Sequence, residues 1–163
     1  MTKREFLLRE TVQESDRKAV RDVLASTGFF YDYEIEVGVE LVAERLAGGE
    51  NSGYLFIFAE TEEKKVSGFT CFGPIPCTAF SYDLFWIAVH HECRGMGVGK
   101  KLLVATEEAV RKMGGKRVYV ETSSRALYEP TRRFYEKHNY LLEAQLKDFY
   151  GLNDSKCIYV KEL

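Results

Sequence analysis

The segment YDLFWIAVHHECRGMGVGKKLL (residues 82–103) carries three structural signals in succession. Residues 82–89 are apolar nearly throughout, which is typical of a central strand covered on both faces. A glycine-rich turn at Arg94–Gly99 follows, and apolar residues then recur at helical spacing. Glycines let the backbone approach a ligand closely, and the first N–H groups of a helix point outward at its positive end. With Lys100 and Lys101 beside it, this unit predicts a site for a diphosphate-bearing cofactor.

Hydrophobic periodicity predicts the elements on either side of this segment. The expected order is strand, helix, helix, three strands, helix, strand, helix and two strands. The strand–helix–strand unit 82–121 must pair in parallel through a right-handed crossover, and the flanking hairpins are antiparallel. The fold class is therefore α/β (α+β), with a central mixed sheet of about seven strands and helices on both faces. Strands are expected near residues 6–8, 54–59, 66–72, 82–89, 117–121, 141–149 and 156–160, and helices near 16–24, 34–47, 99–113 and 130–138.

Two local features of the first two helices are also predicted. Ser15 or Asp16 is expected to cap the first helix, because short polar side chains accept hydrogen bonds from the first free N–H groups. The second helix is expected to end at Gly48 and Gly49. Its buried stripe is expected to consist of Val39, Val42, Ala43 and Leu46.

Length and composition fit a single domain over residues 1–163. The net charge of −2 gives no reason to expect a nucleic-acid or membrane partner. The four cysteines follow no framework spacing, which favours reduced thiols in the cytosol. The cluster His90, His91 and Cys93 lacks a second ligand pair, so no metal is expected. Neither a signal peptide nor a membrane span is predicted, which favours a cytoplasmic protein.

Two common phosphate-binding motifs fail at defining positions of the glycine turn. A Walker loop requires glycine where Arg94 stands, and serine or threonine where Lys101 stands. A dinucleotide fingerprint counted from Gly95 and Gly97 requires glycine where Lys100 stands.

The pattern that fits is Arg94-x-x-Gly97-x-Gly99. It resembles the (Gln/Arg)-x-x-Gly-x-(Gly/Ala) signature of the GNAT superfamily of N-acetyltransferases, which share the histone-acetyltransferase-related fold. The resemblance covers nearly the whole chain in element order and is strongest over residues 82–140, including the tail RRFYEKHNY at 132–140. It implies a GNAT-like sheet with a parallel, splayed strand pair in the middle, where the thioester enters the gap.

The resemblance also implies how acetyl-CoA is bound. The main chain at Ile87 and Val89 would bond the pantetheine arm, and the Ile87 N–H would face the thioester oxygen, where it stabilises an oxyanion. Arg94 would position the phosphate loop. Backbone N–H groups of that loop would cradle the pyrophosphate, namely those of Gly95, Gly97, Val98, Gly99 and Lys100.

Further coenzyme contacts follow from the start of the last helix. Tyr128 stands where many family members carry an asparagine that contacts pantetheine, and it can donate a hydrogen bond although it is bulkier. Thr122 or Ser123 is an alternative for this contact. Arg132, or its neighbour Arg133, is expected to meet the 3′-phosphate, the alternative being an ordinary solvated helix arginine.

Two side chains are implied as catalytic groups. Tyr135 matches the family's tyrosine acid, which supplies a proton to the departing thiolate; the alternative is a core aromatic beside Phe134. Asp83 aligns with the catalytic glutamate of histone-type members. Four strand residues separate it from Ile87, or roughly 13 Å, so it would deprotonate an ammonium through water or bind it as an ion pair. The alternative is an exposed strand-end aspartate.

The expected substrate walls alternate aromatic and acidic residues at 29–36 (FFYDYEIE) and 148–154 (DFYGLND). Ion pairing and cation–π contact suit a cationic amine, so a small amine or an amino-bearing side chain is the expected acceptor. The alternative is solubilising acids on loops beside core aromatics. The predicted substrate residues are Phe30, Tyr31, Asp32, Tyr33, Asp83, Asp148 and Tyr150.

The leading functional prediction is therefore an acetyl-CoA-dependent N-acetyltransferase that acts on a primary amine by direct attack in a ternary complex. The alternative is a non-catalytic CoA-binding or regulatory module on the same fold. The sequence leaves open the identity of the amine, a longer acyl donor, and whether the chain is a monomer or a homodimer.

Overall fold

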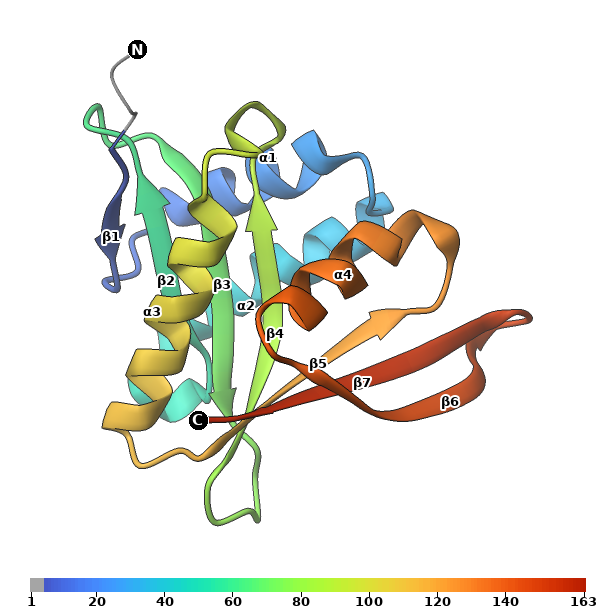
Figure 1. Ribbon diagram of the computed structural model, residues 1–163. Coiled ribbons are helices and arrows are strands. Elements are labelled where there is room, and N and C mark those ends of the chain that lie inside the picture. Colours follow the sequence, from blue (N-terminus) through green and yellow to red (C-terminus); the bar gives the residue numbers. More distant parts are fainter. Residues whose placement is uncertain (1–4) are drawn as a thin grey trace. The chain divides into compact units, whose positions relative to one another are not determined.

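The computed structural model describes residues 5–163 and contains the predicted elements in the predicted order (Figure 1). Three short 3-10 turns are added to them: η1 (Gly49–Ser52), η2 (His91–Cys93) and η3 (Ala126–Tyr128). The strands are β1 (Leu7–Arg9), β2 (Leu55–Glu60), β3 (Val66–Pro74), β4 (Ser81–Val89), β5 (Arg117–Ser123), β6 (Leu141–Gly151) and β7 (Asp154–Glu162). The helices are α1 (Asp16–Thr27), α2 (Asp32–Gly48), α3 (Val98–Lys112) and α4 (Glu129–Lys137).

The strands form one mixed sheet of seven strands in the order β1-β2-β3-β4-β5-β7-β6. The hairpins β2–β3 and β6–β7 are antiparallel, and β4 pairs with β5 in parallel, as predicted. The register of the parallel pair joins Ser81–Asp83 to Arg117–Tyr119, at the beginning of both strands. The predicted mixed α/β fold class is therefore confirmed.

The chain divides into two compact units. The first consists of Met1–Gly73 and Trp86–Ala109, and the second of Pro74–Phe85 and Val110–Leu163. Both β4 and α3 contribute residues to each unit. The expectation of a single domain stays a prediction.

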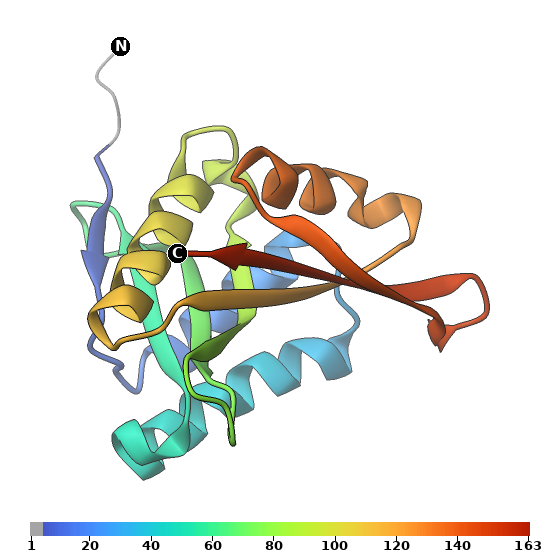
Figure 2. The same cartoon turned by 60° about the horizontal axis from the view of Figure 1, so that its bottom comes forward.

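In the first unit, helices cover both faces of the strands. Figures 1 and 2 show α3 on one face of β2 and β3, and α1 and α2 on the other. Helix α1 lies close to α2 at Gly38, where a Cβ atom would come within 2.6 Å of Leu24 Cδ1. A larger residue at this position would force the Leu24 side chain to shift. Fully buried side chains of this core include Val20, Leu24, Val42, Phe58 and Phe69.

The buried face of α2 differs from the predicted stripe. Of the four predicted residues only Val42 is fully buried, and the others lie at the margin. The buried stripe is thus a neighbouring one that includes Gly38, the residue at which α2 approaches Leu24 of α1. The buried residues of α2 are Ile35, Gly38, Leu41 and Val42.

The start of α1 also differs from the prediction. Ser15 occupies the N-cap position, but its side chain makes no capping hydrogen bond. The Asp16 carboxylate is 1% exposed and accepts hydrogen bonds from Arg9 at 2.7 and 2.9 Å and from the Gln13 N–H at 2.7 Å. Arg9 also pairs with Glu60 at 2.7 Å. The carboxylate is thus used for a buried ion network that fastens β1, α1 and β2 together, instead of for capping.

In the second unit, α4 lies beside the long β6–β7 hairpin (Figure 2). Pro130 occupies the first turn of α4, as predicted. Alternation along β5 places Val118, Val120 and Thr122 on the buried face. Tyr159 of β7 lies on that face too, and its hydroxyl donates a hydrogen bond to Glu136 of α4 at 2.9 Å. The other face of these strands is more open.

Three further expectations concern the cysteines, a metal site and a membrane span. All four cysteines are free thiols; Cys77 is exposed and the other three are buried. Within residues 5–163, no three His, Cys, Asp or Glu side chains gather in a way that could hold a metal ion. In the same residues, no helix combines the length and the apolarity that crossing a bilayer requires.

Candidate active site

The predicted phosphate loop lies in the first unit between η2 and α3. Gly95 and Gly97 have φ values of 74° and 82°, which side-chain-bearing residues rarely adopt. A Cβ atom built on either glycine would meet nothing within 4 Å, so the approach to the backbone is open. Helix α3 begins directly afterwards at Val98, and its N-terminus is therefore accessible to an anion.

Two hydrogen bonds fasten this loop to the end of α1. The Arg94 guanidinium donates to the Thr27 carbonyl at 3.2 Å and lies 5.1 Å from the centroid of the Phe29 ring. The His91 N–H donates to Ser26 Oγ at 3.1 Å. This geometry fits the expectation that Arg94 positions the loop.

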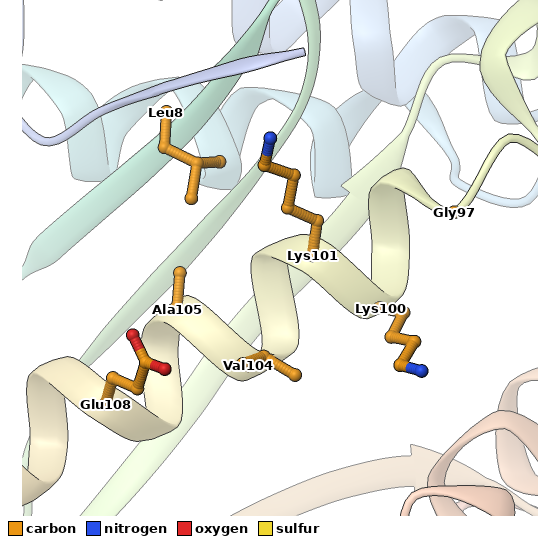
Figure 3. Close-up of a pocket in the computed structure, with 7 residues that line it drawn as sticks. All are labelled: Leu8, Gly97, Lys100, Lys101, Val104, Ala105 and Glu108. Carbon is orange, nitrogen blue, oxygen red and sulfur yellow. The ribbon is translucent and has the colours of Figure 1, made fainter. Parts of the chain in front are cut away.

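A shallow pocket of about 350 Å³ adjoins the loop (Figure 3). Its two lysines point in different directions in Figure 3. Lys101 Nζ donates to the Phe6 carbonyl, whereas Lys100 extends from the other side of α3. Lys100 is thus the better placed of the two for a phosphate. The lining residues are Leu8, Gly97, Lys100, Lys101, Val104, Ala105 and Glu108.

The end of β4 in the first unit carries the proposed pantetheine contacts. Ile87 and Val89 are half-buried and, two residues apart, face the same side of the strand. Trp86 packs edge-to-face against Phe30 at 5.1 Å between ring centroids. A Cβ atom on Gly68 would lie 2.8 Å from the Ala88 carbonyl oxygen, so a glycine is needed where this part of β4 meets β3.

The predicted substrate residues of the first unit surround the beginning of α2. Phe30 is half-buried against Trp86, which joins it to the core. Tyr31 and Tyr33 are 59% and 67% exposed and stack at 5.6 Å. Asp32 is the first residue of α2 and is also exposed. Of this group, the stacked tyrosines and Asp32 remain accessible to a ligand.

In the second unit, Tyr135 lies in an aromatic cluster. It is 5% exposed, and its ring centroid lies 5.6 Å from that of Tyr140 and 6.2 Å from that of Tyr159. Burial raises the pKa of its phenol, so the hydroxyl stays protonated at neutral pH. Tyr135 is thus a core aromatic whose hydroxyl keeps its proton.

Thr122 and Ser123, the two alternatives for a coenzyme contact, differ in their hydrogen bonds. Ser123 Oγ donates to Asp154 and accepts from the Arg125 N–H at 3.1 Å. Thr122 is 6% exposed, and its buried hydroxyl has no partner among residues 5–163. A buried hydroxyl without a partner is costly, which favours Thr122 as the ligand contact.

The residues at the start of α4 have structural partners. Arg132 donates to the carbonyls of Ser123 at 2.7 Å and Arg125 at 2.9 Å. The alternative of an ordinary solvated Arg132 is therefore wrong, because its guanidinium braces the turn after β5. Arg133 pairs with Glu129 at 2.5 Å. Tyr128 is the N-cap residue of α4, and the Arg125 guanidinium lies 5.5 Å from its ring centroid.

Asp83 lies on the open face of the second unit, in register with Tyr119 of β5. It is half-buried, so the alternative of an exposed strand-end aspartate is wrong. Burial raises the pKa of Asp83 to about 6; the negative charge of Glu121 adds to the rise, and the positive charge of Lys156 opposes it. A carboxyl with such a pKa is suited to accept a proton near neutral pH.

Glu121 and Lys156 form an ion pair of 2.8 Å beside Asp83, which the sequence pattern did not predict. The alternation in β5 places Glu121 on the same face as Tyr119, but only the β5–β7 register brings Lys156 to it. The central strand was expected to be covered on both faces. Phe85 is instead 41% exposed, so this part of β4 is open on one side.

The β6–β7 hairpin contains the last two predicted substrate residues. Asp148 has a φ of 53°, and its carboxylate accepts a hydrogen bond from the Asn153 N–H at 2.9 Å, which closes the hairpin turn. Tyr150 lies near Lys156, with 5.9 Å between the ammonium and the ring centroid. Burial raises the pKa of Tyr150 to about 12, and Glu121 and Asp154 add to the rise. Tyr150 therefore joins the Asp83 side of the unit, whereas Asp148 has a structural role in the turn.

Comparisons with known proteins identify the family and the fold of the chain. Residues 17–140 match the acetyltransferase (GNAT) family. A protein from Desulfovibrio desulfuricans that is assigned to the GNAT acetyltransferases is 44% identical, with a TM-score of 0.95 over 97% of this chain and 99% of that chain. No curated protein matches the chain.

Two more distant crystal structures share the fold. An aminoglycoside 6′-N-acetyltransferase from Enterococcus faecium is 19% identical, with a TM-score of 0.75 over 96% of both chains. The PaiA N-acetyltransferase from Thermoplasma acidophilum, in complex with coenzyme A, is 20% identical, with a TM-score of 0.73 over 98% of this chain and 99% of that chain. By its sequence match and its 44% identical relative, the chain belongs to the GNAT family of acetyltransferases.

Proposed function

We propose that the chain transfers the acetyl group of acetyl-CoA to a primary amine by direct attack of the amine. The observation that carries this proposal is the open glycine loop at the N-terminus of α3, with Gly95 and Gly97 at positive φ and free space above both. The PaiA N-acetyltransferase from Thermoplasma acidophilum, which shares the fold, was crystallised with coenzyme A, and this supports the choice of cofactor.

The residues present suit the coenzyme. When bound, acetyl-CoA supplies an acyl thioester. N–H groups of the loop from Gly95 to Lys100 bind its pyrophosphate, and Arg94 keeps the loop in place. The main chain of Ile87 and Val89 would bond the pantetheine, and the Ile87 N–H would stabilise negative charge on the carbonyl oxygen. The partnerless hydroxyl of Thr122 supplies one further polar contact.

Asp83 is the proposed proton acceptor. An attacking amine must be neutral, whereas a free alkylammonium has a pKa of about 10.4. Asp83 takes this proton through a water molecule, or first binds the ammonium as an ion pair. Because the pKa of Asp83 is raised to about 6, its carboxylate is charged at neutral pH and is a stronger base than an ordinary aspartate.

Tyr135 is the proposed acid at the departing sulfur. The pKa of an unperturbed phenol is about 10 and that of a thiol is about 8.5. Proton transfer from the phenol to the thiolate is therefore unfavourable by about 2 kcal/mol. Burial raises the pKa of Tyr135 and so makes this proton transfer still less favourable. Its hydroxyl would therefore first donate a hydrogen bond to the leaving sulfur, and would supply the proton that the thiolate needs.

The test is release of thiol from acetyl-CoA with a panel of amines that includes alkylamines, aminosugars and acidic amino compounds. We expect turnover with cationic acceptors, and a fall in kcat/KM as the pH drops through about 6, because Asp83 then becomes protonated. In Asp83→Asn this acidic limb disappears together with most of the activity. Turnover of acidic acceptors alone would rule out the proposed substrate class. Acetyl-CoA binding without thiol release from any amine would favour the non-catalytic module.

A further inference from the structure

The ion pair between Glu121 and Lys156 is built into the open face of the second unit. Lys156 of β7 stands opposite Ser123 of β5, so Glu121 is its diagonal neighbour on the same face. Lys156 Nζ lies 2.8 Å from Glu121 Oε2. The side chain of Lys156 is only 14% exposed, whereas that of Glu121 is 48% exposed.

Aromatic rings of the β6–β7 hairpin hold the ammonium group in this place. Lys156 Nζ lies 3.8 Å from the centroid of the Phe149 ring and 5.9 Å from that of Tyr150. A cation over an aromatic face is attracted by the ring quadrupole, and its long apolar stem is shielded from water. The charge of Lys156 therefore has a fixed position, unlike that of an ordinary surface lysine.

Asp83 belongs to the same face. It is in register with Tyr119, and Glu121 follows Tyr119 by two residues, so both project to the side of Asp83. Asp83 thus experiences two opposite charges: Glu121 raises the pKa of its carboxyl, and Lys156 lowers it. The neighbouring charges on this face are otherwise engaged. Arg117 pairs with Glu162 at 2.8 Å, and Asp154 bonds to Ser123 and pairs with Arg125.

We propose that Glu121 and Lys156 are a positioning pair for Asp83: the fixed ammonium of Lys156 offsets the negative charge of Glu121 beside the Asp83 carboxylate, which accepts a proton from the substrate ammonium. This inference rests on the proposed function for the role of Asp83, but the charge state itself is a property of the ligand-free chain. The pair does not touch the reacting atoms and acts through Asp83.

The proposal predicts shifts of opposite sign for the two partners. Lys156→Met leaves the Glu121 carboxylate uncompensated, so Asp83 ionises at a pH higher by about 0.5–1 unit. Glu121→Gln leaves the ammonium uncompensated, so Asp83 ionises at a pH lower by a similar amount. The double variant removes both charges and returns the titration close to that of the unmodified chain. A structural role alone would make the double variant the worst of the three.

The experiment follows the side-chain carboxyl carbon of Asp83 by NMR across pH 4–8 (about half a unit per step) in the ligand-free chain, and the pH profile of kcat/KM in parallel. Asp83→Asn assigns the signal. The matched control is Lys161→Met, which removes the same charge from the opposite face of β7, where its ammonium lies 5.6 Å from the Tyr140 ring centroid. This control is expected to leave the Asp83 titration unchanged.

The two readouts separate this inference from the proposed function. Opposite shifts in the NMR titration that are absent from the activity profile would uphold the pair and refute Asp83 as the base. Unmoved NMR titrations, or shifts of the same sign in both single variants, would overturn the pair whatever the activity does. If Lys156→Met does not fold, Glu121→Gln decides the question alone, because the Glu121 side chain is half exposed and its replacement should be tolerated. The expected result is a lower pH for the Asp83 titration.

Discussion

Among single residues, Thr122 and Tyr135 of the second unit are both buried, but their surroundings differ. Tyr135 is enclosed by aromatic rings that would pack as well against phenylalanine. The hydroxyl of Thr122 is buried and has no hydrogen-bond partner among residues 5–163. Packing therefore explains the ring of Tyr135 but not its hydroxyl. At position 122, valine would fill the same space without burying a hydroxyl, so packing does not explain the threonine either.

For Thr122→Val we expect opposite effects on folding and binding. The free energy of unfolding should rise by about 1 kcal/mol, because a buried hydroxyl without a partner is removed at nearly constant volume. The Kd for acetyl-CoA should rise about fivefold, since one hydrogen bond is lost. Urea unfolding and calorimetric titration measure the two quantities.

The matched control is Thr70→Val in the first unit, where the Thr70 and Thr106 hydroxyls are hydrogen-bonded at 2.9 Å and fully buried. This change should lower the free energy of unfolding by about 1 kcal/mol. A loss of stability in Thr122→Val as well would mean that its hydroxyl has a partner within the folded chain.

Tyr135→Phe should lower kcat by roughly 100-fold or more and leave the Kd for acetyl-CoA within about twofold, because only the hydroxyl acts on the leaving thiolate. Stopped-flow thiol release and equilibrium binding distinguish the two parameters. Unfolding should be little affected, since the aromatic contacts are retained. Equal losses in binding and turnover would assign Tyr135 a structural role.

At the scale of elements, the loop before α3 is held by backbone conformation and by its attachment to α1. The sequence predicted the loop because glycine spacing is a local signal. It did not predict the attachment of Arg94 to Thr27, because this contact depends on how the end of α1 is placed in the first unit. The buried stripe of α2 also keeps helical spacing but is displaced from the predicted one, because packing against α1 and the sheet decides which face of a helix is buried.

Replacing Gly97 by valine tests whether the loop binds the pyrophosphate, and the same change at Gly114 is the control because its backbone conformation is nearly identical. Gly97 and Gly114 have φ values of 82° and 83°, and a Cβ atom meets nothing within 4 Å at either position. Both Gly97→Val and Gly114→Val should lose stability through the left-handed backbone, by about 1–2 kcal/mol. Only Gly97→Val should raise the KM for acetyl-CoA, by about tenfold or more, because its side chain occupies the path of the phosphates. Equal KM values in the two variants would contradict the placement of the pyrophosphate.

At the scale of the whole molecule, the chain has two compact units, and several elements contribute residues to both. The strand β4 and the helix α3 each supply residues to both units. Neither unit is a continuous segment of the chain, and this is the physical basis for expecting cooperative unfolding.

Two local probes can test the single-domain prediction. Trp86, the sole tryptophan, reports on the first unit, and Cys77, the exposed cysteine, can be labelled selectively with a dye to report on the second. We expect the urea midpoints of the two signals to coincide and to move together to higher urea on addition of acetyl-CoA. At a hundredfold excess over Kd, the free energy of unfolding should rise by about 2.7 kcal/mol. Separate midpoints would identify two independently stable domains.

The sequence alone determined the order of the elements, the mixed sheet, the glycine loop and the position of Tyr135 on α4. Periodicity, turn residues and helix starts are encoded by neighbours along the chain, so they can be recognised without knowledge of the fold. Only the tertiary structure decided that Lys156 meets Glu121 beside Asp83, that Thr122 lacks a partner, and that Asp16 binds Arg9. These outcomes depend on strand register and burial, which are set by packing between residues far apart in the chain.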